Sequence, residues 1–132
     1  MNRNKYRALL FGLNYEGSNE ELYGCVNDVK NMEKFLTEKY NFKCDSFTNK
    51  KDTSAISIIS KLYELALESR IKRLRYVWIH YSGHGTYSLD KNKDELDGND
   101  ECIVPSDFNL IPDDTIQRIL KKFYHRTKII FI

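Results

Sequence analysis

Apolar and polar positions along this chain fall into blocks that predict alternating strands and helices. The apolar run from Tyr6 to Leu13 is closed by Asn14, a pattern typical of a strand that is buried on both faces. Shorter segments predict further strands from their apolar, aromatic and β-branched residues: 43–47, 75–81, 102–104 and 127–132.

Helices are predicted between these strands, because apolar residues recur there every three or four positions. The first helix begins after a cap at Asn27 or Asp28, the second begins near Thr53, and the third spans Pro112 to Phe123. The residues expected to face the core are, in chain order, Val29, Met32, Phe35 and Leu36; Ile56, Ile59, Leu62, Tyr63 and Ala66; and Ile116, Ile119, Leu120 and Phe123. Strands that alternate with helices predict an α/β fold whose mainly parallel sheet is covered on both faces.

Composition narrows the class of protein. Hydrophobic residues make up 41% and charged residues 30% of the 132 residues, and no repeat or linker interrupts them, so we expect one globular domain over 1–132. The net charge of +2 is too small to indicate nucleic acid or an anionic membrane as a partner, and no apolar run is long enough to span a bilayer. Three cysteines at irregular spacing predict neither a disulfide framework nor a zinc site, which favours a cytoplasmic location.

The motif HYSGHGT is the strongest candidate for chemistry. His84 lies between Gly83 and Gly85 just past a predicted buried strand, where the two glycines leave its imidazole accessible to a substrate backbone. A histidine in such a place suits general acid–base catalysis, although it can equally cap the end of a strand. His80, inside the strand, is expected to be a satisfied core or supporting residue, and His125 a surface residue.

An acidic stretch follows this motif. It has a local charge of about −4, from six carboxylates less two lysines: Asp90, Asp94, Glu95, Asp97, Asp100 and Glu101, with Lys91 and Lys93. From spacing alone, a solvated loop is a better interpretation than a calcium site, and an EF-hand fails because Glu95 replaces its invariant glycine. Capping explains Asp113 and Asp114, which start the third predicted helix, and it also explains Asp28.

Several segments match known motifs in order and spacing: ALLFGLNYEGSNEELYGCVNDV (8–29), HYSGHGT (80–86), DGNDECIVPSD (97–107) and IPDDTI (111–116). Together they resemble the metacaspase branch of the caspase-like cysteine peptidases, over nearly the whole chain. The resemblance implies a caspase-like three-layer α/β/α sandwich. It also implies a cysteine endopeptidase that cleaves proteins or peptides after arginine or lysine with a Cys–His dyad, stimulated by calcium.

The resemblance assigns roles to particular residues. His84 matches the general base and acid of the dyad, and the backbone N–H of Gly85 matches a donor to the oxyanion. Asp28 matches a buried carboxylate of the primary specificity pocket, which Cys25 and Ser82 also line and which selects a basic substrate side chain.

Calcium is the cofactor that the resemblance implies. The matching aspartates of calcium-dependent members correspond to Asp97, Asp113 and Asp114. This reverses the interpretation that spacing alone gives for the acidic stretch, because hard carboxylate oxygens are the ligands that calcium prefers.

The final predicted strand, TKIIFI, runs in that family into an Asp-x-Cys motif whose cysteine is the nucleophile. This sequence ends at Ile132, so the resemblance implies a domain truncated after the fourth core strand and inactive alone. None of Cys25, Cys44 and Cys102 matches the nucleophile. Two alternatives stay open. One is a non-catalytic caspase-fold module that pairs with a partner through its exposed C-terminal strand, and a weaker one is a metal-dependent hydrolase that uses His84 and the aspartates.

Overall fold

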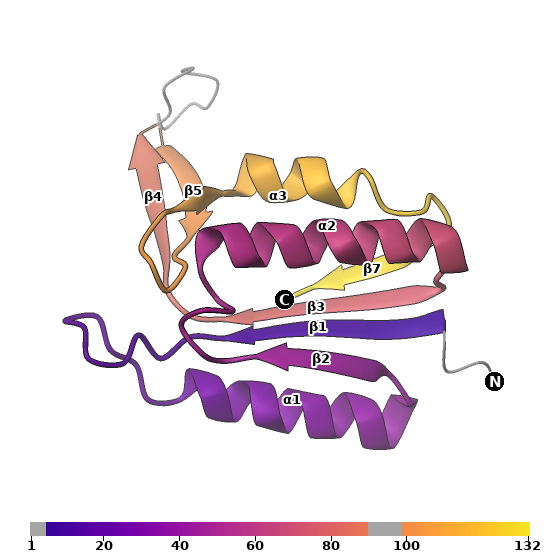
Figure 1. Cartoon of the computed structure of the whole chain (residues 1–132), viewed down its shortest axis with the longest axis horizontal. Coiled ribbons are helices and arrows are strands. Elements are labelled where there is room, and N and C mark those ends of the chain that lie inside the picture. The colour runs from indigo at the N-terminus through magenta and orange to yellow at the C-terminus, as the bar shows by residue number, and fades with distance from the viewer. Residues whose placement is uncertain (1–4, 90–98) are drawn as a thin grey trace.

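Within residues 5–89 and 99–132, which the computed structural model describes, the centre is a four-stranded sheet (Figure 1). All its pairings are parallel, in the order β2-β1-β3-β7. The strands are β1 (Tyr6–Gly12), β2 (Lys43–Phe47), β3 (Tyr76–Ser82) and β7 (Lys128–Phe131). The predicted mainly parallel sheet is therefore confirmed, with β1 and β3 in its middle.

Helices cover both faces of this sheet. Helix α1 (Cys25–Tyr40) lies on one face, and α2 (Ala55–Lys72) and α3 (Asp113–Leu120) lie together on the other (Figure 1). This is the three-layer arrangement that the alternation of elements predicts. In the part of the chain that the structure describes, no helix is both long and apolar enough to cross a membrane.

The two layers of the core are divided by alternation along β1. Leu9 and Phe11 belong to the cluster packed under α2 and α3, whereas Ala8 and Leu10 belong to the cluster packed under α1. Successive side chains of a strand point to opposite faces, so one apolar run supplies both layers.

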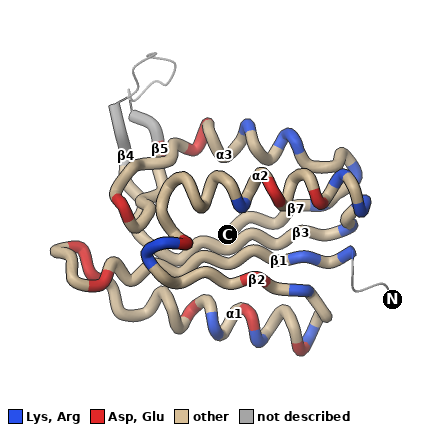
Figure 2. Tube along the Cα trace, in the orientation of Figure 1, with Lys and Arg blue, Asp and Glu red and all other residues tan. Residues whose placement is uncertain are grey.

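Residues with charged side chains lie mostly along the helices and near the ends of the strands (Figure 2), and most of those described are exposed or half-buried. The guanidinium of Arg7 on β1 is an exception, since the residue is buried. It forms ion pairs with Asp45 of β2 at 2.5 Å and with Glu68 of α2 at 3.0 Å. Because a buried charge without a partner is costly, these carboxylates allow Arg7 to lie within the sheet.

A smaller antiparallel sheet projects from the carboxyl end of the large one (Figure 1). It consists of β4 (Gly85–Leu89), β5 (Asn99–Ile103) and β6 (Ile111–Pro112). The sequence predicted one strand here, at 102–104. It missed β4, where a glycine and polar residues interrupt the apolar pattern, and it missed β6, a strand of two residues whose Pro112 was predicted to start the third helix. Most of the acidic stretch, 90–98, lies outside the described residues.

The start of α1 differs from the prediction. The helix begins at Cys25, not after Asn27 or Asp28, and its N-cap residue Gly24 provides no side-chain hydrogen bond. The Oδ1 atom of Asn14 accepts the bonds from the Cys25 and Val26 amides instead, at 3.0 and 3.3 Å. The cap comes from the end of β1, so a local pattern could not reveal it.

The buried face of α2 is rotated from the predicted one. Leu62 and Ala66 are buried as expected, but Ile56 and Tyr63 are 75% and 44% exposed. The buried face is Ile58, Leu62, Leu65, Ala66 and Ser69. The prediction failed here because apolar residues occur on opposite sides of this helix, so periodicity does not choose between them.

Candidate active site

The HYSGHGT motif and the loop between β1 and α1 meet at one edge of the sheet. All four strands of the large sheet run parallel, so their carboxyl ends share this edge (Figure 1). The Leu13 amide donates to the Ser82 carbonyl at 2.9 Å and ties the end of β1 to the end of β3. Sites in parallel α/β sheets gather at this edge.

The half-buried imidazole of His84 is held from two directions. Its Nε2 lies 2.7 Å from the main-chain oxygen of Glu20, in the loop between β1 and α1. Its ring lies against that of Tyr15, with 4.6 Å between the ring centroids. A carbonyl oxygen only accepts hydrogen bonds, so in a neutral ring Nε2 carries the proton and Nδ1 keeps the lone pair that can accept another.

Two tyrosine hydroxyls hold the main chain of His84. The His84 amide donates to Tyr15 Oη at 2.8 Å, and Tyr81 Oη donates to the His84 carbonyl at 2.7 Å. The Tyr15 hydroxyl also donates to the Val104 carbonyl at 2.7 Å, and the two hydroxyl oxygens lie 3.0 Å apart. Burial raises the pKa of Tyr15 and that of Tyr81, so both hydroxyls stay protonated at neutral pH.

Gly83 makes room for this pair of hydroxyls. A Cβ atom at Gly83 would lie 2.8 Å from the Oη of Tyr15 and 2.8 Å from the Oη of Tyr81, which is too close for either side chain to stay in place. Tyr15 itself has φ of 54°, a left-handed conformation that is uncommon outside glycine and that clusters at functional sites.

Asp28 lies in the first turn of α1, and its Oδ2 accepts a hydrogen bond from Ser82 Oγ at 2.9 Å. The structure therefore brings together two of the residues predicted for a specificity pocket. Gly12 allows the approach, because a Cβ there would lie 2.8 Å from the carbonyl oxygen of Cys25. The expectation of a buried carboxylate is wrong: Asp28 is exposed, because the first turn of α1 lies at the open edge of the sheet, whereas Cys25 is buried.

His80 is buried on β3, but neither of its ring nitrogens has a hydrogen-bond partner among the described residues. It is buried, as expected of a core residue, but the hydrogen bonds of a satisfied core residue are not found among the described residues. Burial lowers the pKa of His80, and the charge of Asp28 opposes this shift. His80 is thus neutral at neutral pH. His125 is exposed, as expected.

The cysteines of this chain are poorly placed to act as nucleophiles. Cys25 and Cys102 are buried. Cys44 pairs with Ala8 near the amino-terminal end of β2, far along the sheet from the His84 edge, and burial raises the pKa of its thiol. A thiolate is the reactive form of cysteine, so a raised pKa argues against this role.

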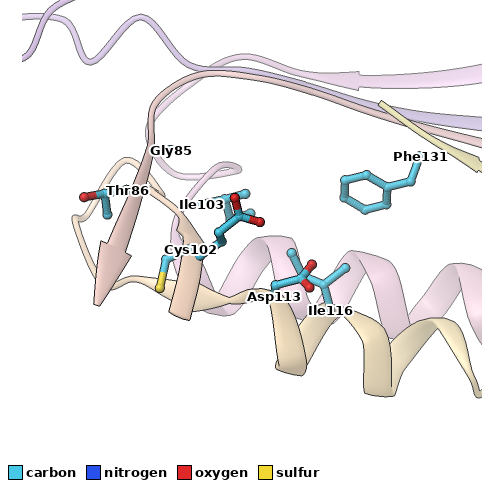
Figure 3. A pocket seen from close by; sticks show the side chains of 8 residues that line it. Gly85, Thr86, Cys102, Ile103, Asp113, Ile116 and Phe131 are labelled. Atoms are coloured by element: carbon cyan, nitrogen blue, oxygen red, sulfur yellow. The ribbon is translucent and has the colours of Figure 1, made fainter. Parts of the chain in front are cut away.

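A cavity of about 360 Å³ lies between the β4–β5 hairpin, α3 and the end of β7. Figure 3 shows Gly85 and Thr86 on one side of it, Asp113 and Ile116 on α3, and Phe131 on β7. The cavity therefore begins immediately beside His84, at its neighbour Gly85. Its lining is mainly apolar, with two acidic residues, Glu101 and Asp113.

Two of the three predicted calcium ligands lie among the described residues. Asp113 and Asp114 are exposed in the first turn of α3, and Asp97 lies outside the described residues. Within 5–89 and 99–132, no three histidine, cysteine or carboxylate side chains come together as a metal site.

Sequence patterns missed several residues that shape the site. Glu20 acts through its main-chain oxygen, for which a sequence carries no signal. Tyr15 and Tyr81 were assigned to a loop and a strand, and their hydroxyls meet only because β1 and β3 are adjacent. The one available signal was the pair of glycines around His84, which indicates crowding as well as access.

Comparison with known proteins places this architecture in a family. The sequence model of the metacaspase, peptidase C14 domain matches residues 6–132. The chain is 43% identical over 122 residues to Metacaspase-7 of Arabidopsis thaliana, covering 88% of this chain and 30% of that protein. It is 39% identical over 123 residues to Metacaspase-1 of Kluyveromyces lactis, covering 86% and 28%. The chain belongs to the metacaspase family of peptidase C14 domains, and it spans about a third of the length of these curated relatives.

Solved structures share this fold. A Geobacter sulfurreducens protein, GSU0716, is similar with a TM-score of 0.75 and 26% identity, over 96% of this chain and 48% of that one. The Drosophila initiator caspase Dronc is similar with a TM-score of 0.69 and 16% identity, over 99% of this chain and 49% of Dronc. The second likeness confirms the caspase-like fold.

Proposed function

We propose that this domain belongs to a cysteine endopeptidase that cleaves after arginine or lysine, with His84 as the base and acid of a Cys–His dyad. The observation that carries the proposal is the contact of His84 Nε2 with the Glu20 carbonyl. This contact fixes the tautomer in which Nδ1 is free to accept a proton from a thiol.

The nucleophile is proposed to follow β7. This strand pairs in parallel with β3, and the Tyr81 amide donates to the Ile132 carbonyl at 2.8 Å. Residues that continue this register would run beside Ser82 and then His84, next to the cavity at Gly85. A cysteine two or three residues beyond Ile132 would meet the imidazole there.

Proton transfer then follows from this arrangement. Nδ1 takes the thiol proton, the sulfur attacks the scissile carbonyl carbon, and the Gly85 N–H is proposed to stabilise the oxyanion. The imidazolium returns the proton to the leaving amine as the carbon–nitrogen bond breaks. Water, deprotonated by the same ring, hydrolyses the thioester and releases the thiol.

Asp28 supports the proposed preference for a basic side chain. Its carboxylate is exposed at the edge of the site, and within the described part of the chain it accepts a hydrogen bond from the Ser82 hydroxyl alone. A carboxylate that keeps free lone pairs can accept hydrogen bonds from a guanidinium or an ammonium group.

Calcium dependence is proposed for the acidic stretch as a whole, with Asp97, Asp113 and Asp114 as ligands by family resemblance. No catalytic step is assigned to the metal. Isothermal titration with calcium chloride, on the chain and on Asp113→Asn with Asp114→Asn, tests it. Equal heats from both proteins would contradict it.

The decisive experiment is cleavage of fluorogenic peptides that end in arginine, lysine or aspartate, by the protein expressed from its natural gene. We expect turnover of the basic peptides and a loss of at least about 100-fold in His84→Ala. The matched control is His125→Ala, which changes an exposed histidine and should leave turnover unaltered. Full activity in His84→Ala would refute the dyad.

A second function is favoured by the edge of the sheet. Among the described strands, β7 lies at the edge of the large sheet, and Phe131 and Ile132 are 38% and 55% exposed. An exposed strand edge can pair with another chain, so a non-catalytic partner role is the alternative. Sedimentation equilibrium distinguishes them, because a monomer with peptidase activity supports only the first.

A further inference from the structure

We propose that Tyr15 and Tyr81 are positioning residues that aim the imidazole of His84 and the N–H of Gly85; the proposal rests on the function proposed for His84. Both hydroxyls contact the main chain where β4 begins. Tyr15 is buried and Tyr81 is half-buried. Tyr81 lies on β3 and Tyr15 follows β1, and these two strands are neighbours in the sheet.

The two hydroxyls lie at the first rung of the β4–β5 hairpin. Gly85 is in register with Ile103, so His84 faces Val104. The Val104 amide donates to the His84 carbonyl at 3.1 Å. The second link of this residue pair, from the His84 amide to the Val104 carbonyl, is bridged by Tyr15. Its hydroxyl accepts from the His84 amide and donates to the Val104 carbonyl.

This rung determines where the Gly85 N–H points. Antiparallel pairs alternate between hydrogen-bonded and non-hydrogen-bonded types, and the His84–Val104 rung is of the bonded type. The N–H of the next residue, Gly85, therefore points away from β5. The His84 carbonyl and the Gly85 N–H belong to one planar trans peptide, so Tyr81, which holds the carbonyl, also fixes the direction of the N–H.

Tyr15 acts on the side chain as well as on the backbone. The centroid of its ring lies 4.6 Å from that of the His84 ring, and the Nε2 atom of the same imidazole is held by the Glu20 carbonyl. One residue thus limits both the rotation of the imidazole and the tilt of the peptide plane. Gly83 keeps the space that this needs, because a Cβ there would meet both hydroxyls at 2.8 Å.

The test removes each hydroxyl and keeps each ring. Tyr15→Phe, Tyr81→Phe and the double variant are compared with Tyr63→Phe, which changes an exposed tyrosine of α2. In the protein expressed from its natural gene, we expect kcat for an arginine peptide to fall at least about 10-fold in each single variant, with KM within about twofold. Inhibition by a peptide aldehyde ending in arginine, which forms an oxyanion in the site, should weaken in parallel.

A readout on the 132-residue chain does not depend on activity. Two-dimensional NMR should show the amide resonances of His84 and Gly85 displaced in both single variants and unmoved in Tyr63→Phe. Unmoved amides, or a kcat within about twofold of wild type while His84→Ala is inactive, would overturn the positioning role alone. Activity in His84→Ala would overturn the proposed function, and the positioning role with it.

Discussion

The two halves of the candidate site differ in how tightly they are held. On the histidine side, His84 is bonded through its ring nitrogen, its amide and its carbonyl, to partners in the loop between β1 and α1 and on β3. On the other side, Asp28 is exposed, and among the described residues its carboxylate accepts one hydrogen bond, from Ser82.

This difference in hydrogen bonding matches the role proposed for each side. Acid–base chemistry needs groups placed to within a fraction of an ångström, and buried hydrogen bonds provide that. A group that binds a flexible substrate side chain needs free lone pairs and room to adjust. We therefore expect changes on the histidine side to damage folding and catalysis together, and changes at Asp28 to affect binding alone.

The largest expected effect is that of Gly83→Ala. The new Cβ would lie 2.8 Å from both tyrosine hydroxyls, so the network must separate, at a cost of about 1–3 kcal/mol and with loss of peptidase activity. Urea denaturation and peptide cleavage measure the two effects. The matched control is Gly24→Ala, because a Cβ at Gly24 has no neighbour within 4 Å. Equal stability of both variants would contradict the crowding argument.

The fold could be predicted from local pattern much further than the site could. Continuous apolar runs and the alternation of strands with helices are enough for β1, β3 and the three layers, because burial acts on every residue of an element. The β4 strand was missed because it starts at a glycine and leads into the acidic stretch. Its partner β5 follows it in the sequence only after the segment 90–98, so the pairing of the two strands is not a local property of the sequence.

The next largest effect is expected for Asp28→Asn. Removing the charge should lower kcat/KM for arginine and lysine peptides roughly 10- to 100-fold, mainly through KM, because a cation then loses its charged acceptor. The free energy of unfolding should stay within about 0.5 kcal/mol, since this is an exposed position. The control is Asp45→Asn, which removes a carboxylate from the Arg7 ion pair instead. A fall in kcat with KM unchanged would show that Asp28 acts in catalysis and not in substrate binding.

The roles within the site show the same limit of sequence reasoning. His84 was identified because its flanking glycines are visible in the sequence. Asp28 was assigned by pattern alone to a helix cap, and only family resemblance pointed to a pocket. The capping atom is in fact Asn14 Oδ1, eleven residues before the first helical residue, and such a contact exists only once β1 and α1 have docked.

The smallest expected effect is the pH dependence set by His80. Its pKa is lowered in the folded protein by burial, so the unfolded chain takes up a proton first as the pH falls below about 6.5. Stability from this source is complete above that pH and declines below it. Urea denaturation at about pH 7.5 and pH 5.5 should show a smaller decline in His80→Phe than in wild type, and His125→Phe is the exposed control. An identical decline in all three proteins would show that His80 does not titrate in this way.

Asn14 also has a consequence for how the domain assembles. Its side chain closes the segment 15–24 into a loop by binding the first amides of α1, and Tyr15 and Glu20, which hold His84, belong to that loop. Helix α1 therefore reaches its full length only after the end of β1 is in place. A folding intermediate in which β1 is unpaired would lack the first turn of α1, the Asp28–Ser82 contact and the support of the imidazole all at once. Both halves of the site should then appear in a single kinetic step.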